Sequence, residues 1–198
     1  MKFALILLVT AVACSGTENR AGSKSLAFAS TDSVRLPDTA FQIKNGLAFH
    51  RQKMFNGSTV EYYSSGNLKL SVAYAGGLEQ GYTHAFYESG QIEYERNYNQ
   101  GEKDGIHTGW WANGNKRFEY HFAKGVYNGD FTEWYEDGKT AKIIQYKDGK
   151  ETAGKGWRNN GKPYMNFIVK DGRRYGLVNA QLCYSVKNEK GEFVESVK

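Results

Sequence analysis

The 198-residue sequence has few cysteines, few prolines and no long apolar run. It contains only two cysteines and two prolines. Its longest apolar run, residues 3–9, is too short to span a bilayer as a helix, which takes about 20 residues. No block of Lys or Arg concentrates the formal charge of +5, and such a diffuse charge does not indicate nucleic-acid binding. Phosphate-cradling glycine loops are also missing, because no Gly-x4-Gly-Lys-Ser/Thr and no Gly-x-Gly-x-x-Gly after a strand occurs.

The sequence is instead rich in glycine and aromatic residues, with 23 glycines and 15% Phe, Trp and Tyr. Aromatic side chains suit a pleated, half-buried sheet, and glycine supplies the positive φ that tight turns need. The mean hydropathy of −0.64 is that of a water-soluble body. This composition favours strands joined by tight turns.

The glycines and aromatic residues recur every 24 residues between Gly57 and about Gly176. The opening glycines are Gly57, Gly81, Gly105 and Gly129, and the aromatic pairs are Tyr62-Tyr63, Phe86-Tyr87, Trp110-Trp111 and Trp134-Tyr135. Further columns are Gly66, Gly90, Gly114 and Gly138, then Tyr74, Tyr98, Phe122 and Tyr146, then Gly77, Gly101, Gly125 and Gly149. A fixed period of this length is typical of a repeat array. A fifth, shorter unit carries Trp157-Arg158 in place of the pair.

Each unit has the pattern of a β-hairpin. Ser-Gly, Asn-Gly or Asp-Gly turns separate the aromatic strand from a second strand whose side chains alternate. In one such strand Leu70, Val72 and Tyr74 share a face, opposite Lys69 and Ser71. We therefore predict an all-β protein, an elongated antiparallel β-hairpin repeat array of about five 24-residue units with capping hairpins.

Four segments follow from this pattern. Residues 1–14 form a targeting segment, 15–39 a flexible small and polar tether, 40–176 the array and 177–198 a C-terminal capping hairpin. The array is expected to begin with an incomplete leading unit, residues 41–57, because Gly46 and Gly57 have the spacing of Gly66 and Gly77.

The targeting segment ends in Ala11-Val12-Ala13-Cys14, which resembles the lipobox of bacterial lipoproteins. The resemblance implies that Cys14 is lipidated and becomes the mature amino terminus, so that the acyl chains hold the protein at a membrane. Ser15 in the next position favours an outer-membrane or surface destination. The alternative is an ordinary signal peptide cleaved after Ala13, with Cys14 left as a free thiol. Lipidation of Cys14 would leave Cys183 without a partner for an intramolecular disulfide.

The repeat itself, for example Gly81-Phe86-Tyr87-Gly90-Tyr98-Gly101-Gly105, resembles the MORN-repeat variant of bacterial proteins. It is similar in particular to envelope lipoproteins and to the YwqK-type antitoxin family. The resemblance covers residues 46–176 and implies an elongated β array used for interaction or scaffolding, without a shared catalytic residue set.

No constellation of residues predicts an enzyme, a metal site or a cofactor. His84 and His107 precede the aromatic pair in successive units, and a cross-strand metal site is conceivable there, but a role on the sheet surface is favoured. Glu93 and Glu95 lie on one strand face, where solvated charges are the rule. We therefore expect a non-enzymatic protein with no metal and no cofactor.

The aromatic pairs are the one candidate binding feature. Because adjacent strand residues point to opposite faces, one row should pack against the second strands and the other is free to line a groove. The candidate partner-binding aromatics are Tyr63, Tyr87, Trp111, Tyr135 and Trp157. Alternatively, this row only holds a single-layer sheet together. We expect a lipid-anchored interaction or scaffolding module that binds an envelope protein, the alternatives being a glycan or peptidoglycan-binding module or an antitoxin-like partner of a toxin.

Overall fold

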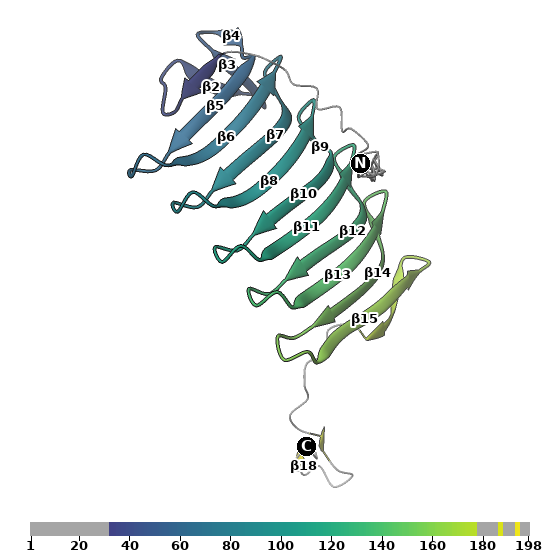
Figure 1. Ribbon diagram of the computed structural model, residues 1–198. Coiled ribbons are helices and arrows are strands. Elements are labelled where there is room, and N and C mark those ends of the chain that lie inside the picture. Colours follow the sequence, from purple (N-terminus) through teal and green to yellow (C-terminus); the bar gives the residue numbers. More distant parts are fainter. Residues whose placement is uncertain (1–31, 178–185, 188–192, 195–198) are drawn as a thin grey trace, which may run out of the picture.

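The computed structural model describes residues 32–177, 186–187 and 193–194, and within them the protein is all-β. One 13-stranded sheet has the order β1-β5-β6-β7-β8-β10-β11-β12-β13-β14-β15-β16, with β9 beside β8 (Figure 1). Neighbouring strands are antiparallel except for β1 and β5, which are parallel. The expected elongated antiparallel array of hairpins is confirmed.

The strands of the main sheet follow one another along the chain. They are β1 (Ser33–Arg35), β5 (Gly57–Tyr62), β6 (Leu68–Ala75), β7 (Leu78–Phe86), β8 (Ile92–Asn99), β9 (Glu102–Lys103), β10 (Gly105–Trp110), β11 (Lys116–Ala123), β12 (Val126–Trp134), β13 (Thr140–Lys147), β14 (Lys150–Trp157), β15 (Pro163–Lys170) and β16 (Arg173–Leu177). Each 24-residue period therefore supplies two long strands, as the alternation predicts.

The hairpin turns lie where the Ser-Gly, Asn-Gly and Asp-Gly pairs predict them. In the first, Gly66 has φ +90° and its amide donates to the Tyr63 carbonyl, while the Tyr63 amide donates to the Asn67 carbonyl. Positive φ is a conformation that glycine adopts without a steric cost. The turns at Gly66, Gly90, Gly114, Gly138 and Gly161 share this bonding and form one long side of the sheet, here called the turn edge (Figure 1).

The opposite side, here called the link edge, consists of the turns at Gly77, Gly101, Gly125, Gly149 and Gly172. Successive turns on this edge are joined by backbone bonds of one form. They run from Gly77 to the Phe55 carbonyl, from Gly101 to Glu79, from Gly125 to Lys103 and from Gly149 to Tyr127. The link edge thus fixes each of these turns to the unit before it.

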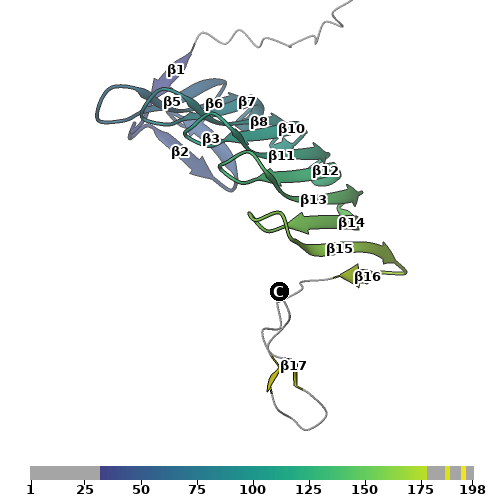
Figure 2. The same cartoon turned by 60° about the horizontal axis from the view of Figure 1, so that its bottom comes forward.

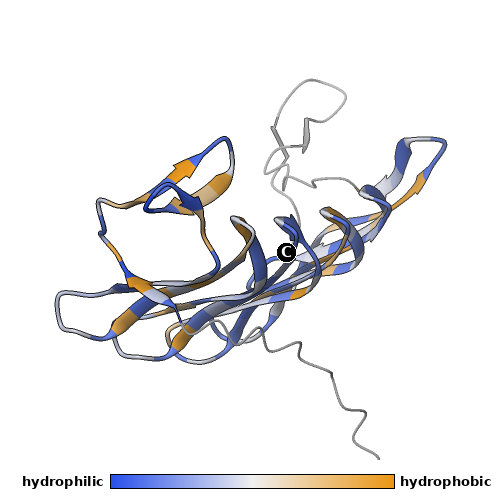
Figure 3. Cartoon of the chain, turned by 90° about the horizontal axis from the view of Figure 1, so that it is seen from above, coloured by the Kyte–Doolittle hydropathy of each residue, from blue (hydrophilic) through white to orange (hydrophobic). Residues whose placement is uncertain are grey.

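The segment expected as an incomplete leading unit folds differently from the other units. It forms a separate sheet of β2 (Phe41–Lys44), β3 (Leu47–His50) and β4 (Lys53–Met54), here called the cap. The cap lies over one face of the N-terminal end of the main sheet (Figure 3). Two contacts hold it there. Phe55, which follows β4, packs against Val34 and Tyr74, and the Ala48 amide of β3 donates a 2.7 Å bond to the Gly77 carbonyl in the turn after β6.

The protein's best-buried hydrophobic cluster lies under the cap. Val34, Ala48 and Phe55 are 7%, 1% and 4% exposed, and Phe41 and Tyr74 pack against them. Val34 belongs to β1, which lies in the segment expected to be tether and instead pairs with β5.

The remaining sequence predictions at the two ends lie largely outside the described residues. This applies to the targeting segment with Cys14, to most of the tether and to Cys183. In the C-terminal segment, β17 (Val186–Lys187) and β18 (Phe193–Val194) pair antiparallel.

Candidate functional site

The predicted binding row lies along the turn edge, where its polar atoms join consecutive hairpins. The Tyr63 hydroxyl donates to the Phe86 carbonyl at 2.7 Å, and the Tyr87 hydroxyl to the Trp110 carbonyl at 2.8 Å. The Trp111 indole donates to the Trp134 carbonyl at 3.2 Å, and the Tyr135 hydroxyl to the Trp157 carbonyl at 2.9 Å. Four of the five predicted residues therefore act as ties between repeats.

Trp157, the fifth predicted residue, lies in the other column. Its carbonyl accepts the bond from Tyr135, the role that Phe86, Trp110 and Trp134 have in earlier units. Arg158 takes the position of the tie residue, since its backbone bonds to Lys162 and Gly161 repeat those of Tyr135 with Lys139 and Gly138. The structure thus brings Tyr63, Tyr87, Trp111 and Tyr135 into one row and places Trp157 beside it.

The two columns of the aromatic pairs have different neighbours, as the alternation predicts. Phe86 stacks on His84 with ring centroids 6.4 Å apart, and Trp111 of the other column lies 5.6 Å from the Arg117 guanidinium. Tyr62 is 39% exposed, whereas the tie residues and Phe86, Trp110, Trp134 and Trp157 are all half-buried. The expected division into a buried row and an exposed row is therefore not seen.

Side chains of the turns add further bonds between the hairpins. The amides of Asn113 and Asn115 both donate to the Glu136 carbonyl, at 2.8 and 2.9 Å. A hollow of about 550 Å³ lies beside them, lined by Trp111, Asn113, Tyr135, Glu136, Asp137 and Asn159. Two of the predicted aromatics, Trp111 and Tyr135, thus line the same hollow.

A second, larger set of aromatic residues covers one face of the sheet and was not singled out by the sequence interpretation as a site. We call it the aromatic face; its residues are Tyr94, Tyr98, Phe118, Tyr120, Phe122, Tyr127, Phe131 and Tyr146. The Tyr120 and Phe131 rings stack at 3.8 Å, and the Phe122 and Tyr127 rings lie 4.6 Å apart. Tyr127 also lies 4.9 Å from Tyr146, so ring contacts cross from β11 through β12 to β13.

Small residues opposite the rings make this packing possible in a single layer. Gly109 pairs with Phe118 across β10 and β11, and a Cβ added at Gly109 would overlap the Phe118 ring. Gly154 has the same relation to Phe167 across β14 and β15. Phe118 and Phe167 are buried as a result, at 7% and 3% exposure. A glycine inside a strand, away from any turn, was the sequence signal for this arrangement.

Cations lie over several rings of the aromatic face. The Arg96 guanidinium is 4.0 Å from the Tyr94 centroid, and the Lys103 ammonium is 5.1 Å from that of Phe122. Lys142 lies 5.2 Å from the Phe131 ring and forms a 3.1 Å ion pair with Glu133. Glu133 in turn accepts a 2.9 Å bond from the Tyr120 hydroxyl, and burial with this carboxylate raises the Tyr120 pKa.

His107 is the buried titratable group of this face, at 2% exposure. Its ring lies 4.5 Å from Phe122 and 5.5 Å from Tyr98, and its Nε2 donates to the Asn97 carbonyl at 2.7 Å. Burial lowers the pKa of His107, because a charged imidazolium would be desolvated there, although the bond to Asn97 opposes the shift. His107 is therefore a neutral core residue.

The other face of the sheet carries most of the charged residues that alternate with the aromatic ones along the strands. His84 lies on it and forms a 3.0 Å contact with Glu95. His84 pairs with Glu95 and Thr108 pairs with Glu95 from the other side, so His107, the neighbour of Thr108, points to the opposite face. The histidine pair considered for a metal site is thus separated by the sheet. Within residues 32–177, 186–187 and 193–194, no group of three or more His, Cys, Asp or Glu is placed to hold a metal ion.

The two carboxylates of β8 have side-chain partners on other strands. Glu95 lies 3.0 Å from His84 of β7, and Glu93 lies 3.5 Å from Arg117 of β11. The part of the chain that the structure describes also holds no helix with the length and apolarity of a membrane span.

The cap covers this side of the sheet at the first unit, and no strand within the described ranges covers the aromatic face in the later units. Tyr74 occupies the column of Tyr98, Phe122 and Tyr146. Its ring lies 5.9 Å from Phe41 and 5.8 Å from Phe55, both from the cap segment. Beside the cap, a hollow of about 480 Å³ is lined in part by Ala48, Tyr74, Leu78 and Tyr98. The cap therefore shows that short strands with aromatic side chains fit on this side of the sheet.

Comparison with known proteins agrees with the repeat architecture. Residues 80–100 and 127–148 match the MORN repeat variant. These two segments run from β7 to β8 and from β12 to β13, so each match spans one hairpin. No curated protein matches the chain. The matches support MORN-type repeats, a class that serves as an interaction module.

One matching solved structure is titled "Crystal structure of accessory secretory protein 1,2 and 3 in Streptococcus pneumoniae". It is 12% identical, with a TM-score of 0.18, over 69% of this chain and 21% of that one. The chain thus spans about a fifth of the length of that relative, and at this TM-score the likeness has no bearing on fold or function.

Proposed function

We propose that the protein is a non-enzymatic interaction module of the cell envelope, anchored through lipid on Cys14 and docking an envelope protein on its aromatic face. The lipobox-like residues 11–14 support the anchor. The interaction role is supported by the MORN-type repeats and by the surface that they build. The outer membrane is the proposed location, because Ser15 follows the cysteine that would be lipidated.

The cap is the single observation that carries the docking proposal. It places Phe41 and Phe55 on Tyr74 and is fixed by the bonds at Gly77. Tyr98 and Tyr146 present the same column of rings without such a cover, and both are half-buried. Aromatic surface provides large contact area at a low cost in side-chain entropy. The partner segment is therefore a β-hairpin or strand with aromatic side chains, laid across the later repeats as the cap lies across the first.

Crosslinking in intact envelopes followed by pull-down of the full chain tests this proposal. Tyr98→Ala and Tyr146→Ala should each reduce recovery of a specific partner several-fold. Tyr82→Ala is the matched control, because Tyr82 is 48% exposed and stacks with His84 on the opposite face. Equal recovery with all three variants would contradict docking on the aromatic face.

The anchor is tested separately. Cys14→Ser should abolish labelling by a palmitate analogue and move the protein from the membrane fraction to the supernatant. Retention of label in Cys14→Ser would contradict lipidation at this residue. Fractionation of inner and outer membranes then tests the proposed location.

Glycan binding is the second candidate function, and the hollow at the turn edge favours it. Trp111 and Tyr135 line it with two asparagines and two carboxylates, so rings for stacking on sugars and groups for hydrogen bonds lie together. Sedimentation with purified cell wall tests this function. Trp111→Phe should lower binding strongly while Tyr98→Ala leaves it unchanged. No binding at micromolar protein would rule out this function.

A further inference from the structure

The net positive charge of the protein is concentrated at the C-terminal end of the main sheet. Residues 150–177, which form β14 to β16, contain seven Lys or Arg and two Asp or Glu. Residues 32–149 contain thirteen Lys or Arg and fifteen Asp or Glu. The repeats are therefore close to neutral, and the last three strands carry a net charge of +5.

This charged end is also an open edge of the sheet. β16 is the last strand in the order and pairs with β15 on one side (Figure 2). No other strand within the described ranges pairs with its far side. All five of its residues are exposed, including Tyr175 at 51% and Leu177 at 41%. Such a strand offers unpaired backbone N–H and C=O groups to an extended chain.

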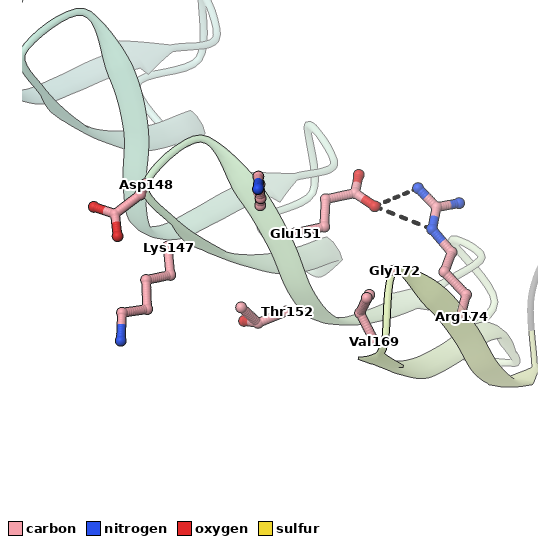
Figure 4. A pocket seen from close by; sticks show the side chains of 8 residues that line it. Lys147, Asp148, Glu151, Thr152, Val169, Gly172 and Arg174 are labelled. Carbon is pink, nitrogen blue, oxygen red and sulfur yellow. Dashed lines mark hydrogen bonds and ion pairs between the residues drawn. The ribbon is translucent and has the colours of Figure 1, made fainter.

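A hollow of about 790 Å³ adjoins this end of the sheet, on the link edge (Figure 4). It is lined by Lys147, Asp148, Lys150, Glu151, Thr152, Val169, Gly172 and Arg174. It forms where the backbone ties of the link edge stop. Each earlier tie joins a turn glycine to the carbonyl 22 residues before it, but among the described residues Gly172 has no such bond to Lys150. The last turn is therefore separated from the turn before it.

Some of the charged side chains around the hollow form ion pairs and others do not. Glu151 accepts bonds from the Arg174 Nε, at 3.0 Å, and from its Nη2 (Figure 4). Lys147, Lys150 and Asp148 form no ion pair within residues 32–177, so the charged side chains that line the hollow carry a net charge of +1. The hollow and edge together thus favour an anionic occupant.

We propose that β16 and the adjoining hollow bind an extended acidic segment of a partner protein, which adds to the sheet as a further strand. Its backbone pairs with the free side of β16, and its carboxylates face Arg173 and Arg174. Main-chain bonds provide affinity in such strand addition, and side chains provide specificity. This second contact surface deepens the proposed interaction role but does not depend on the aromatic face.

Two other occupants fit this end less well. A second copy that paired through β16 would bring Arg173 and Arg174 of two chains together, and like charges on neighbouring strands destabilise a sheet. An anionic membrane attracts cations that gather on one surface. Arg173 and Arg174 are adjacent in β16 and therefore point to opposite faces, so the charge surrounds the edge instead of lying in one plane.

Fluorescence anisotropy with synthetic octapeptides and the full purified chain tests the proposal. The probe repeats Glu-Glu-Val-Val, so that both of its strand faces carry carboxylates. One control peptide replaces every glutamate with lysine. A second control keeps the glutamates but carries N-methyl groups on alternate backbone amides, which removes donors for strand pairing. We expect saturable binding of the first peptide alone. Equal binding of the N-methylated peptide would overturn strand addition, and no saturable binding of the glutamate peptide at 1 mM would overturn the site.

Variants of the chain locate the binding. The double change Arg173→Glu and Arg174→Glu should weaken binding at least tenfold, whereas Lys124→Glu, at an exposed turn of the repeats, should leave it unchanged. Tyr98→Ala should also bind the peptide normally, so failure of this inference and failure of the aromatic-face proposal are distinguishable. If Lys124→Glu weakened peptide binding as much as the double change, binding would depend on net charge alone, and the proposed site would be overturned. Binding to phosphatidylglycerol vesicles without peptide binding would favour a membrane and overturn the proposal.

Discussion

The hydroxyl of Tyr87 donates a 2.8 Å hydrogen bond to the carbonyl of Trp110, which belongs to the next repeat. The donor and acceptor lie 23 residues apart, as they do for Tyr63 with Phe86 and for Trp111 with Trp134. The polar atoms of these aromatic side chains thus fasten the hairpins to one another. Their contribution to stability is measurable.

Tyr87→Phe should lower the free energy of unfolding by about 1 kcal/mol, because it removes one half-buried hydrogen bond and leaves the Trp110 carbonyl without this donor. Urea denaturation checks the value. Tyr175→Phe is the control, since Tyr175 is 51% exposed on the edge strand. Equal stability of Tyr87→Phe and the wild type would contradict a role as a tie.

Gly109→Ala should destabilise the protein by about 1 to 3 kcal/mol, the usual cost of overpacking. The added methyl group would overlap the Phe118 ring, which lies over the glycine. Combining Gly109→Ala with Phe118→Leu tests the cause. Because the smaller side chain removes the overlap, the two changes together should cost less than their sum. Strict additivity would show that the ring is not what restricts this position.

His107 should make stability depend on pH below about 6.5, the ordinary pKa of histidine. Burial lowers its pKa in the folded state, so the unfolded chain binds the proton first as the pH falls. Stability from this group is therefore complete above pH 6.5 and decreases as the pH drops toward the folded pKa. Urea denaturation at several values between pH 7 and 5 should give a steeper slope for the wild type than for His107→Gln.

Met54→Ala, which removes an exposed side chain without a titratable group, serves as the control for the pH series and should keep the wild-type slope. Two carboxylates with shifted pKa values act in another pH range or in the opposite sense. The bond from Lys116 lowers the pKa of Glu119, so its contribution is lost only below about pH 4. Burial raises the pKa of Glu79, which favours the folded state as pH falls. Identical slopes for His107→Gln and the wild type would contradict the assignment to His107.

Phe55→Ala should loosen the cap and leave the later repeats intact. Phe55 is 4% exposed and contacts Phe41 and Tyr74, and its loss should cost the cap about 3 to 5 kcal/mol. Hydrogen exchange should therefore accelerate at the Ala48 and Gly77 amides but remain slow at Gly125. Met54→Ala, at a residue that is 54% exposed, is the control. Uniform acceleration along the sheet would show that the cap and array unfold together.

The sequence was sufficient to predict the array because its period and its turn chemistry are local signals. Gly66 and its counterparts mark the turns, and the alternation around Val72 assigns the faces. The cap was not predicted, since Asn45-Gly46 has the same signal as the array turns although its strands fold back over β5 and β6. Only long-range packing of Phe55 distinguishes the two outcomes.

The candidate site was predicted in part. The row of Tyr63, Tyr87, Trp111 and Tyr135 is real, but periodicity does not reveal that their polar atoms bond to the next repeat. The aromatic face was not predicted as a site for a related reason. Its rings were assigned to the packed side of the sheet, and sequence alone did not indicate that no described strand covers this side beyond the cap.

The regular offset of the turn-edge bonds makes the array extendable by whole units. A tie residue needs only a carbonyl one period further along, so removing or duplicating one period leaves every remaining donor with an equivalent acceptor. The cap and the positively charged strands β14 to β16 would keep their local structures, while each added or removed period would change the distance between them by a fixed amount. The number of repeats therefore sets the distance between the cap and β16.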